Sequence, residues 1–458
     1  MRLLTERLLV IGADAAGMSA AAQARRLREP DDLDIVAFDR GNFSSYSACG
    51  IPYYVGRVVD DVDDLVVRTP EVFAEKHSIE VHVRHEVVEV DLERGVASVH
   101  HRDGGHRREE GFDVLMVATG AVPMRPPLPG ADAAGVFGVQ TLDDGLAVRA
   151  FVDDREPRRA VIVGGGYVGL EMAEAFCGLG LETHLVDAAP QPMTGLDPDM
   201  GELVAEELRK FGTVLHLGQP VTGFETADDG RVAAVATEGV AIPADVVVLG
   251  LGVKPEASVA EAAGVGLGPS GGIAVDRRMR TSHPAVWAAG DCAEKHHRVS
   301  GRPVTVALGT HANKEGRVAG VNLGGGYATF PGVIGTAATK VGALEVARTG
   351  LNEAEAAEAG FLTEATVSES TTRAGYFPGS APMTSKLVVE QGTGRLLGAQ
   401  IVGREGSGKR IDSFALAVWN GMTVGDLLGV DLSYAPPYSP VWDPVLAAAR
   451  RAYERRAR

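Results

Sequence analysis

The first pattern along the chain is a set of short hydrophobic runs that end at glycine. Residues 8–11 are apolar and lead directly into the segment Gly12-Ala-Asp-Ala-Ala-Gly17. A run with helical spacing follows over residues 18–27, and a second apolar run over residues 34–39 ends in Asp39. A strand, a tight glycine turn, a helix and a strand closed by an acid predict the dinucleotide-binding half of a Rossmann-type domain.

The same order of elements returns in the middle of the chain. Residues 160–163 predict a strand, Gly164-Gly-Gly-Tyr-Val-Gly169 predicts a second glycine turn, and the residues up to 179 predict a helix. The next strand, residues 183–187, again ends in an acid, Asp187. The repetition predicts two separate dinucleotide sites in one chain.

Further apolar runs extend these units, and the pattern then changes. Residues 113–120 and 245–252 are buried runs that end at glycine. After about residue 330, residues 387–390 and 396–402 read as antiparallel strands and two amphipathic helices follow. We therefore expect an α/β fold with two doubly wound, Rossmann-type dinucleotide-binding domains and a C-terminal α+β domain.

Composition and charge narrow the possible partners. The 45% hydrophobic content and 58 glycines suit a globular α/β protein with many tight turns. The formal net charge of -17 repels nucleic acid and anionic membrane surfaces. No run reaches the roughly 18 apolar residues that a membrane span needs. We therefore expect neither a nucleic-acid partner nor a membrane partner.

Cysteine usage indicates the compartment. Cys49, Cys177 and Cys292 lie far apart in the chain. They show neither the even spacing of a secreted disulfide framework nor the paired spacing of a zinc site. We therefore expect a cytoplasmic protein with no metal site.

The glycine turns indicate phosphate binding because a helix N-terminus presents unpaired N–H groups to a pyrophosphate, while glycine lets the backbone come close. The second turn matches this pattern fully with Gly164, Gly166 and Gly169. In the first turn Gly12 and Gly17 match, but Asp14 replaces the middle glycine. Asp39 and Asp187 stand where an acid binds the ribose hydroxyls.

The acid of the second turn also bears on the choice of nicotinamide nucleotide. A carboxylate at Asp187 accepts a hydrogen bond from a ribose 2′-hydroxyl but repels a 2′-phosphate. Residues 188–191 contain no Arg that could offset this repulsion. The sequence therefore favours NADH over NADPH.

These motifs together resemble the flavoprotein disulfide reductase superfamily that binds two dinucleotides. The resemblance rests on both glycine turns, on Ala118-Thr-Gly120, on Leu249-Gly-Leu-Gly252 and on Ala288-Ala-Gly-Asp291-Cys, and it covers almost the whole chain. It implies FAD at the first turn with Asp291 on the ribityl chain, and NAD(P)H at the second turn. It also implies further cofactor contacts from Ala16, Arg40, Ser47, Ala118, Thr119, Gly120, Val168, Gly252 and Gly290.

Two residues after the second turn have two interpretations. The resemblance implies that Tyr167 covers the flavin until the nicotinamide displaces it, and that Glu171 lies near the same face. The alternative is that Tyr167 packs at the start of a helix and Glu171 complements the helix dipole.

The resemblance also divides the chain into domains. It implies an FAD-binding domain in two parts, an NAD(P)-binding domain between them, and a C-terminal dimerisation domain that makes the protein a homodimer. The expected ranges are 1–153 and 253–329 for FAD, 154–252 for NAD(P), and 330–458 for dimerisation.

The redox group selects a branch of the superfamily. Glutathione and lipoamide reductases carry a Cys-x4-Cys pair and a C-terminal His-x4-Glu pair, and this chain has neither. Instead, Ser45-Tyr-Ser-Ala-Cys49-Gly-Ile-Pro-Tyr-Tyr-x-Gly56 resembles the branch with one cysteine, which contains coenzyme A-disulfide reductases, persulfide reductases, and NADH oxidases and peroxidases. We expect Cys49 to lie near the flavin at a helix start, with a lowered thiol pKa.

Other positions bear on the substrate. The oxidases and peroxidases have a His in the first glycine turn where this chain has Ala15, which argues against oxygen and peroxide. Several residues match coenzyme A contacts of the disulfide reductases, although Ala48 stands where those enzymes often have Asn. The matching residues are Gln23, Arg26, Ser45 and Asn313.

Two tyrosines in the C-terminal part complete the resemblance. Tyr376 and Tyr434 match a pair that the partner subunit supplies in coenzyme A-disulfide reductases, where a phenol can stabilise or protonate a leaving thiolate. Lone tyrosines in Pro-rich loops are otherwise packing residues. Cys177 is expected in a helix core, and Cys292 close to the flavin.

The expected enzyme passes hydride from NAD(P)H through FAD to Cys49 and reduces a low-molecular-weight disulfide or persulfide, with coenzyme A as the first candidate thiol. Two alternatives stay open. One is an NADH oxidase or diaphorase that reduces oxygen, quinones or metal ions. The other is a redox-sensing flavoprotein that acts on a protein partner.

Overall fold

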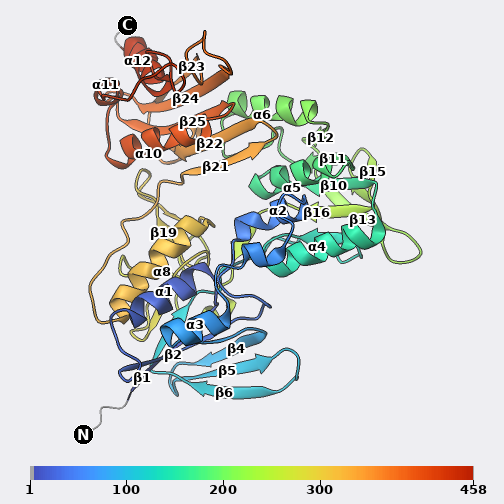
Figure 1. The fold of residues 1–458 in the computed structure, drawn as a ribbon, viewed down its shortest axis with the longest axis vertical. Coiled ribbons are helices and arrows are strands. Elements are labelled where there is room, and N and C mark those ends of the chain that lie inside the picture. The colour runs from blue at the N-terminus through green and yellow to red at the C-terminus, as the bar shows by residue number, and fades with distance from the viewer. Residues whose placement is uncertain (1–4, 457–458) are drawn as a thin grey trace.

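The computed structural model describes residues 5–456, which form three units of secondary structure (Figure 1). The two glycine turns lie in the first two units, and the C-terminal unit stands at the far end of the molecule from the N-terminus. The expected combination of two α/β nucleotide-binding units with a C-terminal α+β unit is confirmed.

The first unit is built on a parallel sheet whose strands are buried on both faces. Helices α1 (Ala15–Arg25) and α8 (Gly309–Leu323) lie side by side on it (Figure 1). The contacting residues Ser19 and Asn313 are 294 positions apart in the sequence. The strand order is β18 (Val286–Ala288), β7 (Val114–Val117), β1 (Glu6–Ile11), β2 (Leu33–Phe38) and β3 (Glu80–His82). Helix α3 (Pro70–His77) directly precedes the edge strand β3 in sequence and packs against it.

Glycines in α8 explain how closely α1 and α8 approach. A Cβ atom at Gly316 would lie 2.3 Å from the carbonyl oxygen of Ala16, and one at Gly320 would lie 2.4 Å from that of Ala20. Any larger residue would force the helices apart. The start of α8 is thereby held beside the start of α1, where the first glycine turn ends.

The second unit repeats the parallel sheet. Helices α4 (Leu142–Arg155), α5 (Tyr167–Gly178) and α6 (Pro198–Lys210) pack on it. The strand order is β12 (Val214–Leu217), β11 (Glu182–Asp187), β10 (Arg159–Val163), β16 (Val246–Leu249) and β9 (Val136–Gly138).

The sheet of the second unit contains one strand that the sequence analysis assigned to the FAD-binding domain. Strand β9 precedes the expected boundary at residue 153, yet it pairs in parallel with β16. Its three residues carry no periodicity that distinguishes a strand from a loop, and only the pairing with β16 shows where it lies.

The C-terminal unit carries an antiparallel sheet with helices on one face. Helices α10 (Ile411–Trp419), α11 (Val424–Leu428) and α12 (Pro444–Arg456) share its core, which contains Phe414 and Leu387. The strand order is β21 (Ala337–Val341), β22 (Leu344–Gly350), β25 (Leu396–Gly403), β24 (Pro382–Glu390) and β23 (Thr363–Thr371). Helix α9 (Glu353–Glu358) follows β22.

Smaller elements connect these units. The segment after β2 forms the 3₁₀ helix η1 (Ala48–Gly50), helix α2 (Ile51–Val55) and the 3₁₀ helix η2 (Val62–Leu65). Helix α7 (Ser258–Ala262) and the 3₁₀ helix η3 (Gly408–Arg410) lie later in the chain. The remaining strands are β4 (His85–Asp91), β5 (Val96–His101), β6 (Arg107–Gly111), β8 (Ala121–Pro123), β13 (Val221–Thr226), β14 (Val232–Thr237), β15 (Ala241–Pro243), β17 (Val253–Pro255), β19 (Lys295–His296) and β20 (Pro303–Val304).

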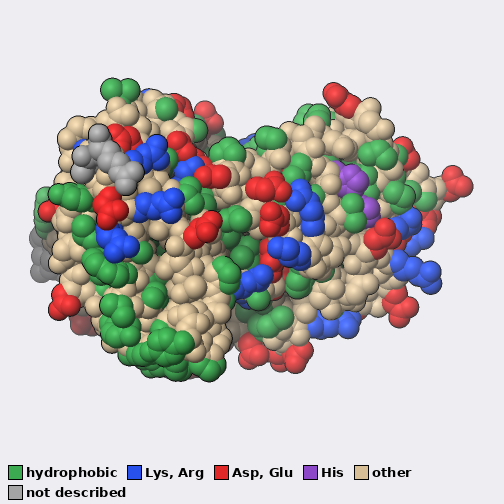
Figure 2. Space-filling view, turned by 90° about the horizontal axis from the view of Figure 1, so that it is seen from above, with side chains coloured by type: hydrophobic (Ala, Val, Ile, Leu, Met, Phe, Trp, Pro, Cys, Tyr) green, Lys and Arg blue, Asp and Glu red, His purple; other side chains and the backbone are tan. Residues whose placement is uncertain are grey.

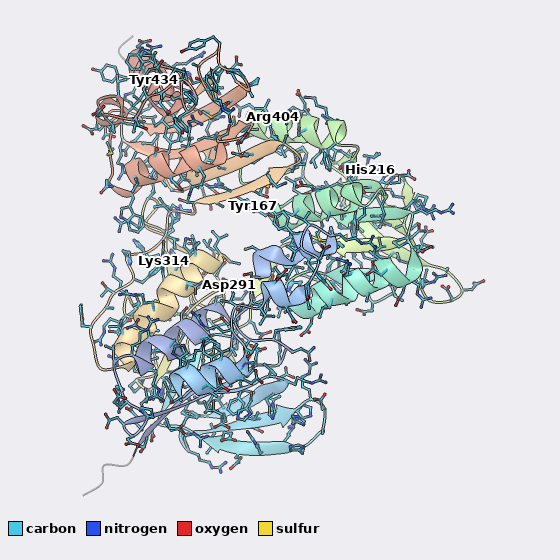
Figure 3. All side chains as sticks on the ribbon, viewed as in Figure 1. Tyr167, His216, Asp291, Lys314, Arg404 and Tyr434 are labelled. Atoms are coloured by element: carbon cyan, nitrogen blue, oxygen red, sulfur yellow. The ribbon has the colours of Figure 1, made fainter. Side chains whose placement is uncertain are left out.

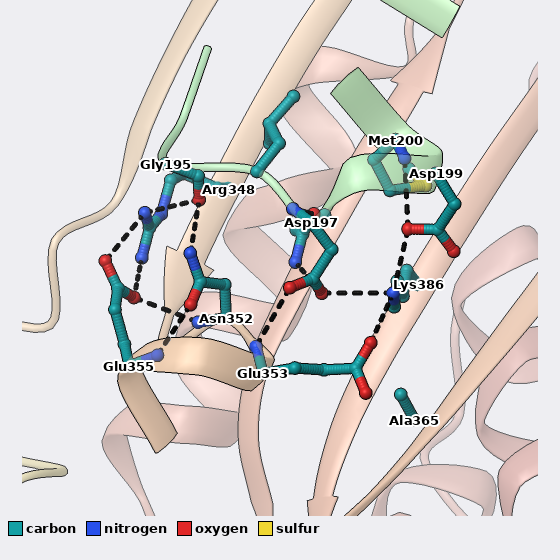
Figure 4. Close-up of polar contacts among 12 residues, drawn as sticks. Gly195, Asp197, Asp199, Met200, Arg348, Asn352, Glu353, Glu355, Ala365 and Lys386 are labelled. Atoms are coloured by element: carbon teal, nitrogen blue, oxygen red, sulfur yellow. Dashed lines mark hydrogen bonds and ion pairs between the residues drawn. The ribbon is translucent and has the colours of Figure 1, made fainter. Parts of the chain in front are cut away.

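A buried polar network joins the C-terminal unit to the second unit (Figure 4). Lys386 on β24 forms ion pairs with Asp197, with Asp199 of α6 and with Glu353 of α9. Nearby, Arg348 donates to the carbonyl oxygen of Gly195 at 2.5 Å. These contacts hold the C-terminal unit of the chain against its own second unit.

Within residues 5–456, no helix has the length and apolar character that crossing a membrane requires.

Candidate active site

The first glycine turn is held by the acid at the end of β2. The Asp39 carboxylate accepts hydrogen bonds from the backbone N–H groups of Ala13 and Gly41, each at 2.8 Å, and burial raises its pKa. Gly12 has a φ of 102°, and a Cβ there would lie 2.1 Å from the carbonyl oxygen of Ala118. A Cβ at Gly17 would lie 1.9 Å from the oxygen of Gly12. The turn therefore requires both glycines.

The second glycine turn uses the same device. Asp187 accepts from the backbone N–H of Gly165 at 2.6 Å and from that of Ala189 at 2.8 Å. Gly164 has a φ of 102°, and a Cβ there would lie 2.4 Å from the oxygen of Gly250. A Cβ at Gly169 would lie 2.0 Å from the oxygen of Gly164, and Gly166 is the N-cap of α5. Both turns therefore present a helix N-terminus over a strand end.

An unpartnered acid lies beside the first turn. Oδ1 of Asp291 is buried and has no hydrogen-bond partner among the described residues, and burial raises the pKa of its carboxyl group. Gly290 has a φ of 86°, and a Cβ there would lie 2.8 Å from that of Ala16. A buried acceptor without a partner fits a ligand hydroxyl such as those of a ribityl chain, so the residues present fit FAD.

The Asp291 segment is positioned by a buried ion pair that sequence reasoning missed. Lys295 Nζ donates to the carbonyl oxygen of Gly290 at 2.7 Å and lies 3.5 Å from Glu315 of α8. Glu315 accepts from the backbone N–H of Gly290 at 2.9 Å, and burial raises its pKa to about 7. Nothing in the sequence marked this pair, because Lys295 stands among polar residues and Glu315 directly follows Lys314.

The remaining expected FAD contacts lie at strand ends around the two turns. Thr119, after β7, donates through Oγ1 to the carbonyl oxygen of Glu256, and Arg40 lies 4.0 Å from the Glu256 carboxylate. Gly120 and Gly252 have φ values of 71° and 84°, in the left-handed region. Ser47 precedes η1 and is exposed.

Cys49 lies in η1, immediately before α2, and is exposed. Partial burial of the thiol raises its pKa, and the nearby carboxylates of Glu171 and Asp291 raise it further. These shifts apply to the chain without FAD, so the lowered pKa that we expect beside a bound flavin stays a prediction. The structure nevertheless brings Cys49 from the first unit together with Glu171 from the second.

Glu171 and Tyr167 lie on the first turns of α5, facing the C-terminal unit (Figure 3). Thr339 of β21 donates to Glu171 at 3.0 Å, and burial raises the pKa of Glu171. Burial also raises the pKa of Tyr167, against the lowering effect of nearby Arg348. Val168, between them in the sequence, packs against the core of the second unit.

Tyr53 is a further aromatic residue at this position. Burial and the charges of Glu171, Glu174 and Cys49 raise the pKa of its phenol. It belongs to the Cys49 motif, but nothing in the sequence indicated that its phenol lies near both Cys49 and Glu171.

Three of the four residues expected to contact coenzyme A, Gln23, Arg26 and Asn313, share one surface formed by α1 and α8. Arg26 donates to Gln23 at 3.3 Å on α1, and Ser19 of α1 donates to Asn313 of α8 at 2.7 Å. Asn313 is exposed, as is the adjacent Lys314 (Figure 3). Sequence reasoning did not single out Ser19 or Lys314, because the pairing of α1 with α8 is not visible in the sequence.

Ser45 lies apart from this helical surface. Its φ of 46° is left-handed, and its backbone N–H donates to the carbonyl oxygen of Ala13 at 2.8 Å. Ser45 thereby connects the first glycine turn to the segment that carries Cys49.

The neighbouring arginines have packing roles. Arg25 donates to the carbonyl oxygens of His77 and Ser78, and Arg28 pairs with Glu6. Arg25 and Arg28 are therefore engaged within the first unit, and Arg26 is the arginine of this group that was expected to contact coenzyme A.

Tyr376 and Tyr434 lie on the surface of the C-terminal unit. They are 78% and 49% exposed, and the pKa of Tyr434 is raised by desolvation and by the neighbouring Tyr376. Figure 3 shows Tyr434 at the far end of the molecule from Asp291. Within one chain the tyrosine pair is therefore not brought to Cys49.

The other cysteines are packed in the interior. The thiol of Cys292 is buried and lies 3.4 Å from the carbonyl oxygen of Ala289, and burial raises its pKa. Cys177 is half-buried, with its sulfur 3.5 Å from Oγ1 of Thr213. All three cysteines of the chain are free.

Comparison with known proteins gives a consistent result. Residues 6–318 match the family described as pyridine nucleotide-disulphide oxidoreductase, and residues 336–444 match the dimerisation domain of the same family. The chain is 37% identical over 448 residues to the NAD(P)H coenzyme A polysulfide/persulfide reductase of Pyrococcus horikoshii, covering 98% of each chain. It is 33% identical to an NADH oxidase of Methanocaldococcus jannaschii, covering 98% of this chain and 99% of that one.

A solved structure shows the same arrangement of units. The NAD-dependent persulfide reductase from A. fulgidus is similar with a TM-score of 0.95 and 37% identity, covering 98% of this chain and 84% of that one. The expected family, the expected fold and the expectation of an oxidoreductase that uses FAD and NAD(P)H are confirmed. The chain belongs to the pyridine nucleotide-disulphide oxidoreductase family.

Proposed function

We propose that the protein reduces a small disulfide or persulfide with electrons from NAD(P)H, and that Cys49 is the sulfur that reacts with the substrate. The observation that carries the proposal is a single exposed cysteine at the junction of the two nucleotide-binding units, beside Glu171 and Asp291. Cys292 is buried, and Cys177 is half-buried in α5 with its sulfur 3.5 Å from Oγ1 of Thr213. The second sulfur of the redox pair is therefore supplied by the substrate.

The sulfur step proceeds by thiol–disulfide exchange. The Cys49 thiolate attacks one sulfur of R–S–S–R′, the S–S bond breaks, R′–S⁻ leaves, and a mixed disulfide Cys49–S–S–R forms. With a persulfide R–S–SH the same attack releases HS⁻. Two electrons from NAD(P)H and one proton then return Cys49 to the thiolate and release R–SH.

The residues that hold FAD are those of the first turn. Gly12, Ala16 and Gly17 would leave room for the pyrophosphate at the start of α1, Asp39 holds the turn through two backbone N–H groups, and Asp291 would accept from the ribityl hydroxyls. When bound, FAD accepts hydride from NAD(P)H and delivers electrons to sulfur. The other expected contacts to FAD lie in the segments around this turn: Arg40, Ser47, Ala118, Thr119, Gly120, Gly252 and Gly290.

The second turn holds the nicotinamide nucleotide through Gly164, Gly166, Val168 and Gly169, with Tyr167 and Glu171 at the face toward Cys49. We propose NADH as the preferred donor. The Asp187 carboxylate, fixed by two backbone N–H groups, lies where a 2′-phosphate would bring a second negative charge.

We propose coenzyme A as the thiol that the substrate carries. Gln23 and Arg26 of α1 and Asn313 of α8 lie on one surface, and Ser45 precedes Cys49 on the other side of the glycine turn. Arg26 and the exposed Lys314 supply positive charge for an anionic thiol carrier in a protein with a net charge of -17.

The assembly that we propose is a homodimer in which Tyr376 and Tyr434 act at the partner's Cys49. Hydrophobic side chains gather at the lower edge of the left lobe in Figure 2, which contains the C-terminal unit. The exposed apolar residues of this unit include Tyr376, Leu416, Tyr434, Tyr438, Val441 and Trp442. A phenol donated by the partner would protonate the leaving thiolate.

The experiment is the exchange of Cys49 for Ser, with Cys177→Ser as the matched control. Cys49→Ser is expected to abolish NADH-dependent reduction of coenzyme A disulfide and coenzyme A persulfide, and Cys177→Ser is expected to retain it. Mass analysis of the protein as purified is expected to show an adduct on Cys49 only. Full turnover by Cys49→Ser would refute the proposal.

An NADH oxidase is the second candidate, because the M. jannaschii relative carries that name. Ala15, in place of the histidine of the oxidases and peroxidases, weighs against it. Rapid reoxidation of the reduced enzyme by air to yield water, with slow reoxidation by disulfide, would favour the oxidase.

A further inference from the structure

The first glycine turn departs from the second at its middle position. Asp14 stands where the second turn has Gly166, and each residue is the N-cap of its helix. Both have extended backbones, with φ, ψ of -111°, -152° at Asp14 and -80°, -170° at Gly166. The backbone at this position therefore accepts a side chain, and a functional reason for Asp14 has to be sought in its contacts.

The Asp14 carboxylate does not cap its own helix. An aspartate at an N-cap ordinarily accepts from the backbone N–H of the second or third helical residue, but Asp14 forms no such capping hydrogen bond. Of the N–H groups of α1, that of Ala15 comes close enough to lower the pKa of Asp14. Instead, its Oδ1 accepts from the backbone N–H of Tyr46 at 3.2 Å. The side chain thus reaches out of the turn to the segment that leads to Cys49.

A second contact runs parallel to the first. The backbone N–H of Ser45 donates to the carbonyl oxygen of Ala13 at 2.8 Å, so two successive residues of the turn bind two successive residues of the segment. The carbonyl oxygen of Ser45 accepts from Val67 at 2.8 Å. The left-handed conformation of Ser45 is held from both sides.

The remainder of the segment is short and continuous with Cys49. The backbone N–H of Ser47 donates to the carbonyl oxygen of Leu65 at 2.8 Å, and that of Gly50 donates to Ser47 at 2.8 Å. Cys49 is therefore three residues from the Asp14 contact, with no loop between them that could absorb a displacement.

The position of Asp14 also places it beside the cofactor site. Burial, with added repulsion from Asp39 and Asp291, raises the pKa of Asp14 to about 7. The middle glycine of such a turn is where the backbone comes close to a pyrophosphate, so bound phosphate would add further negative charge at the same place. The Asp14 carboxyl group thus lies between the expected flavin site and the segment that leads to Cys49, to which its Oδ1 is hydrogen-bonded.

We propose that Asp14 is a positioning residue that couples occupancy of the flavin site to the conformation of residues 45–49 and so to the placement of the Cys49 thiol. The importance of that thiol rests on the proposed function, but the coupling itself does not. Asp14 touches the backbone of the segment and acts on Cys49 only through it.

The test compares Asp14→Gly, Asp14→Asn and the control Asp31→Asn. Asp14→Gly reproduces the residue of the second turn and removes the contact, whereas the Asn amide oxygen can still accept from Tyr46. Asp31 is exposed and lies on the loop after α1, so Asp31→Asn removes one negative charge without touching the turn.

Two readouts are measured on the full chain, with and without FAD. The first is hydrogen exchange of the peptide that contains Tyr46. The second is the alkylation rate of Cys49 by iodoacetamide, which requires no turnover. In wild type, FAD is expected to slow both readouts. In Asp14→Gly, exchange at Tyr46 is expected to be about fivefold faster, as loss of one hydrogen bond to a largely uncharged carboxyl group implies.

The outcomes separate the alternatives. In Asp14→Asn and Asp31→Asn, FAD is expected to slow both readouts as it does in wild type. In Asp14→Gly, FAD is expected to have little effect on the alkylation rate of Cys49. If Asp14→Gly retains wild-type exchange at Tyr46 and the wild-type response of Cys49 to FAD, the coupling is refuted. Failure of the proposed function shows instead as turnover by Cys49→Ser, which neither readout measures.

Discussion

The buried cation between the second and C-terminal units gives the sharpest test of how the chain is held together. The side chain of Lys386 is 5% exposed, and its Nζ lies 3.2 Å from Asp197, 2.8 Å from Asp199 and 2.5 Å from Glu353. Asp197 is itself 3% exposed. We consider Lys386→Met, which retains the aliphatic stem and removes the charge (Figure 4).

The expected cost follows from what the substitution leaves behind. Asp199 and Glu353 are about half exposed and regain water, but Asp197 stays buried. Removing one partner of a buried ion pair costs about 3–5 kcal/mol. Asp197 still accepts from Gln400 Nε2 at 2.7 Å and from the backbone N–H of Glu353 at 3.0 Å, so we expect a loss near about 3 kcal/mol.

The assay is thermal unfolding of the apoprotein at pH 7, combined with hydrogen exchange at α6 and α9. Burial alone would lower the pKa of Lys386, but the hydrogen bonds to Asp199 and Glu353 outweigh it and raise the pKa. A raised pKa means that the contribution of the cation to stability is fully present below the ordinary lysine range, and pH 7 lies well below it. The Tm is expected to fall by about 3 °C, with faster exchange at the interface.

Two matched variants test the reasoning. Lys409 is 89% exposed and pairs with Asp412, so Lys409→Met is expected to change the Tm very little. The double variant Lys386→Met/Asp197→Asn removes the stranded charge and is expected to regain part of the lost stability. The reasoning fails if Lys386→Met loses no more than Lys409→Met, or if the double variant is no more stable than Lys386→Met.

Three further predictions concern the nucleotide sites. The pKa of Asp14 is raised from 3.8 to about 7, so its carboxyl group costs stability as pH rises from about 4 to about 7. The stability of Asp14→Asn relative to wild type should therefore increase between about pH 5 and about pH 8. Equal differences in urea midpoint at the two pH values would contradict this. Gly12→Ala, with its Cβ 2.1 Å from the oxygen of Ala118, should abolish FAD retention in fluorescence titrations, and wild-type affinity would show that the turn relaxes. Asp187→Ala should lower the KM for NADPH relative to NADH, and an unchanged ratio would remove Asp187 as the discriminating residue.

Much of the fold followed from short-range patterns. The strands before Gly12 and Gly164 and the helices after Gly17 and Gly169 form as expected, because a positive φ and a close backbone approach allow few residues other than glycine. The pairing of strand β9 with β16 was not predicted, because three residues carry no pairing information.

The candidate site, too, was predicted only in part. Cys49 was found from its motif, and the structure places it in a 3₁₀ helix as an exposed residue. The acids beside it, which raise its pKa, were not predictable, because Glu171 comes from another unit more than a hundred residues away. Lys295 and Glu315 were missed for the same reason, since their 3.5 Å contact joins a strand to α8.

The sequence by itself determined the two nucleotide turns, the motif around Cys49 and the family, because each depends on residues that are neighbours along the chain. The tertiary structure decided which groups face that cysteine, that Asp14 binds the backbone of Tyr46 and forms no capping hydrogen bond with its own helix, and that Lys386 joins two units. These contacts depend on burial and on charges brought together from distant segments, and only the folded chain sets either of them.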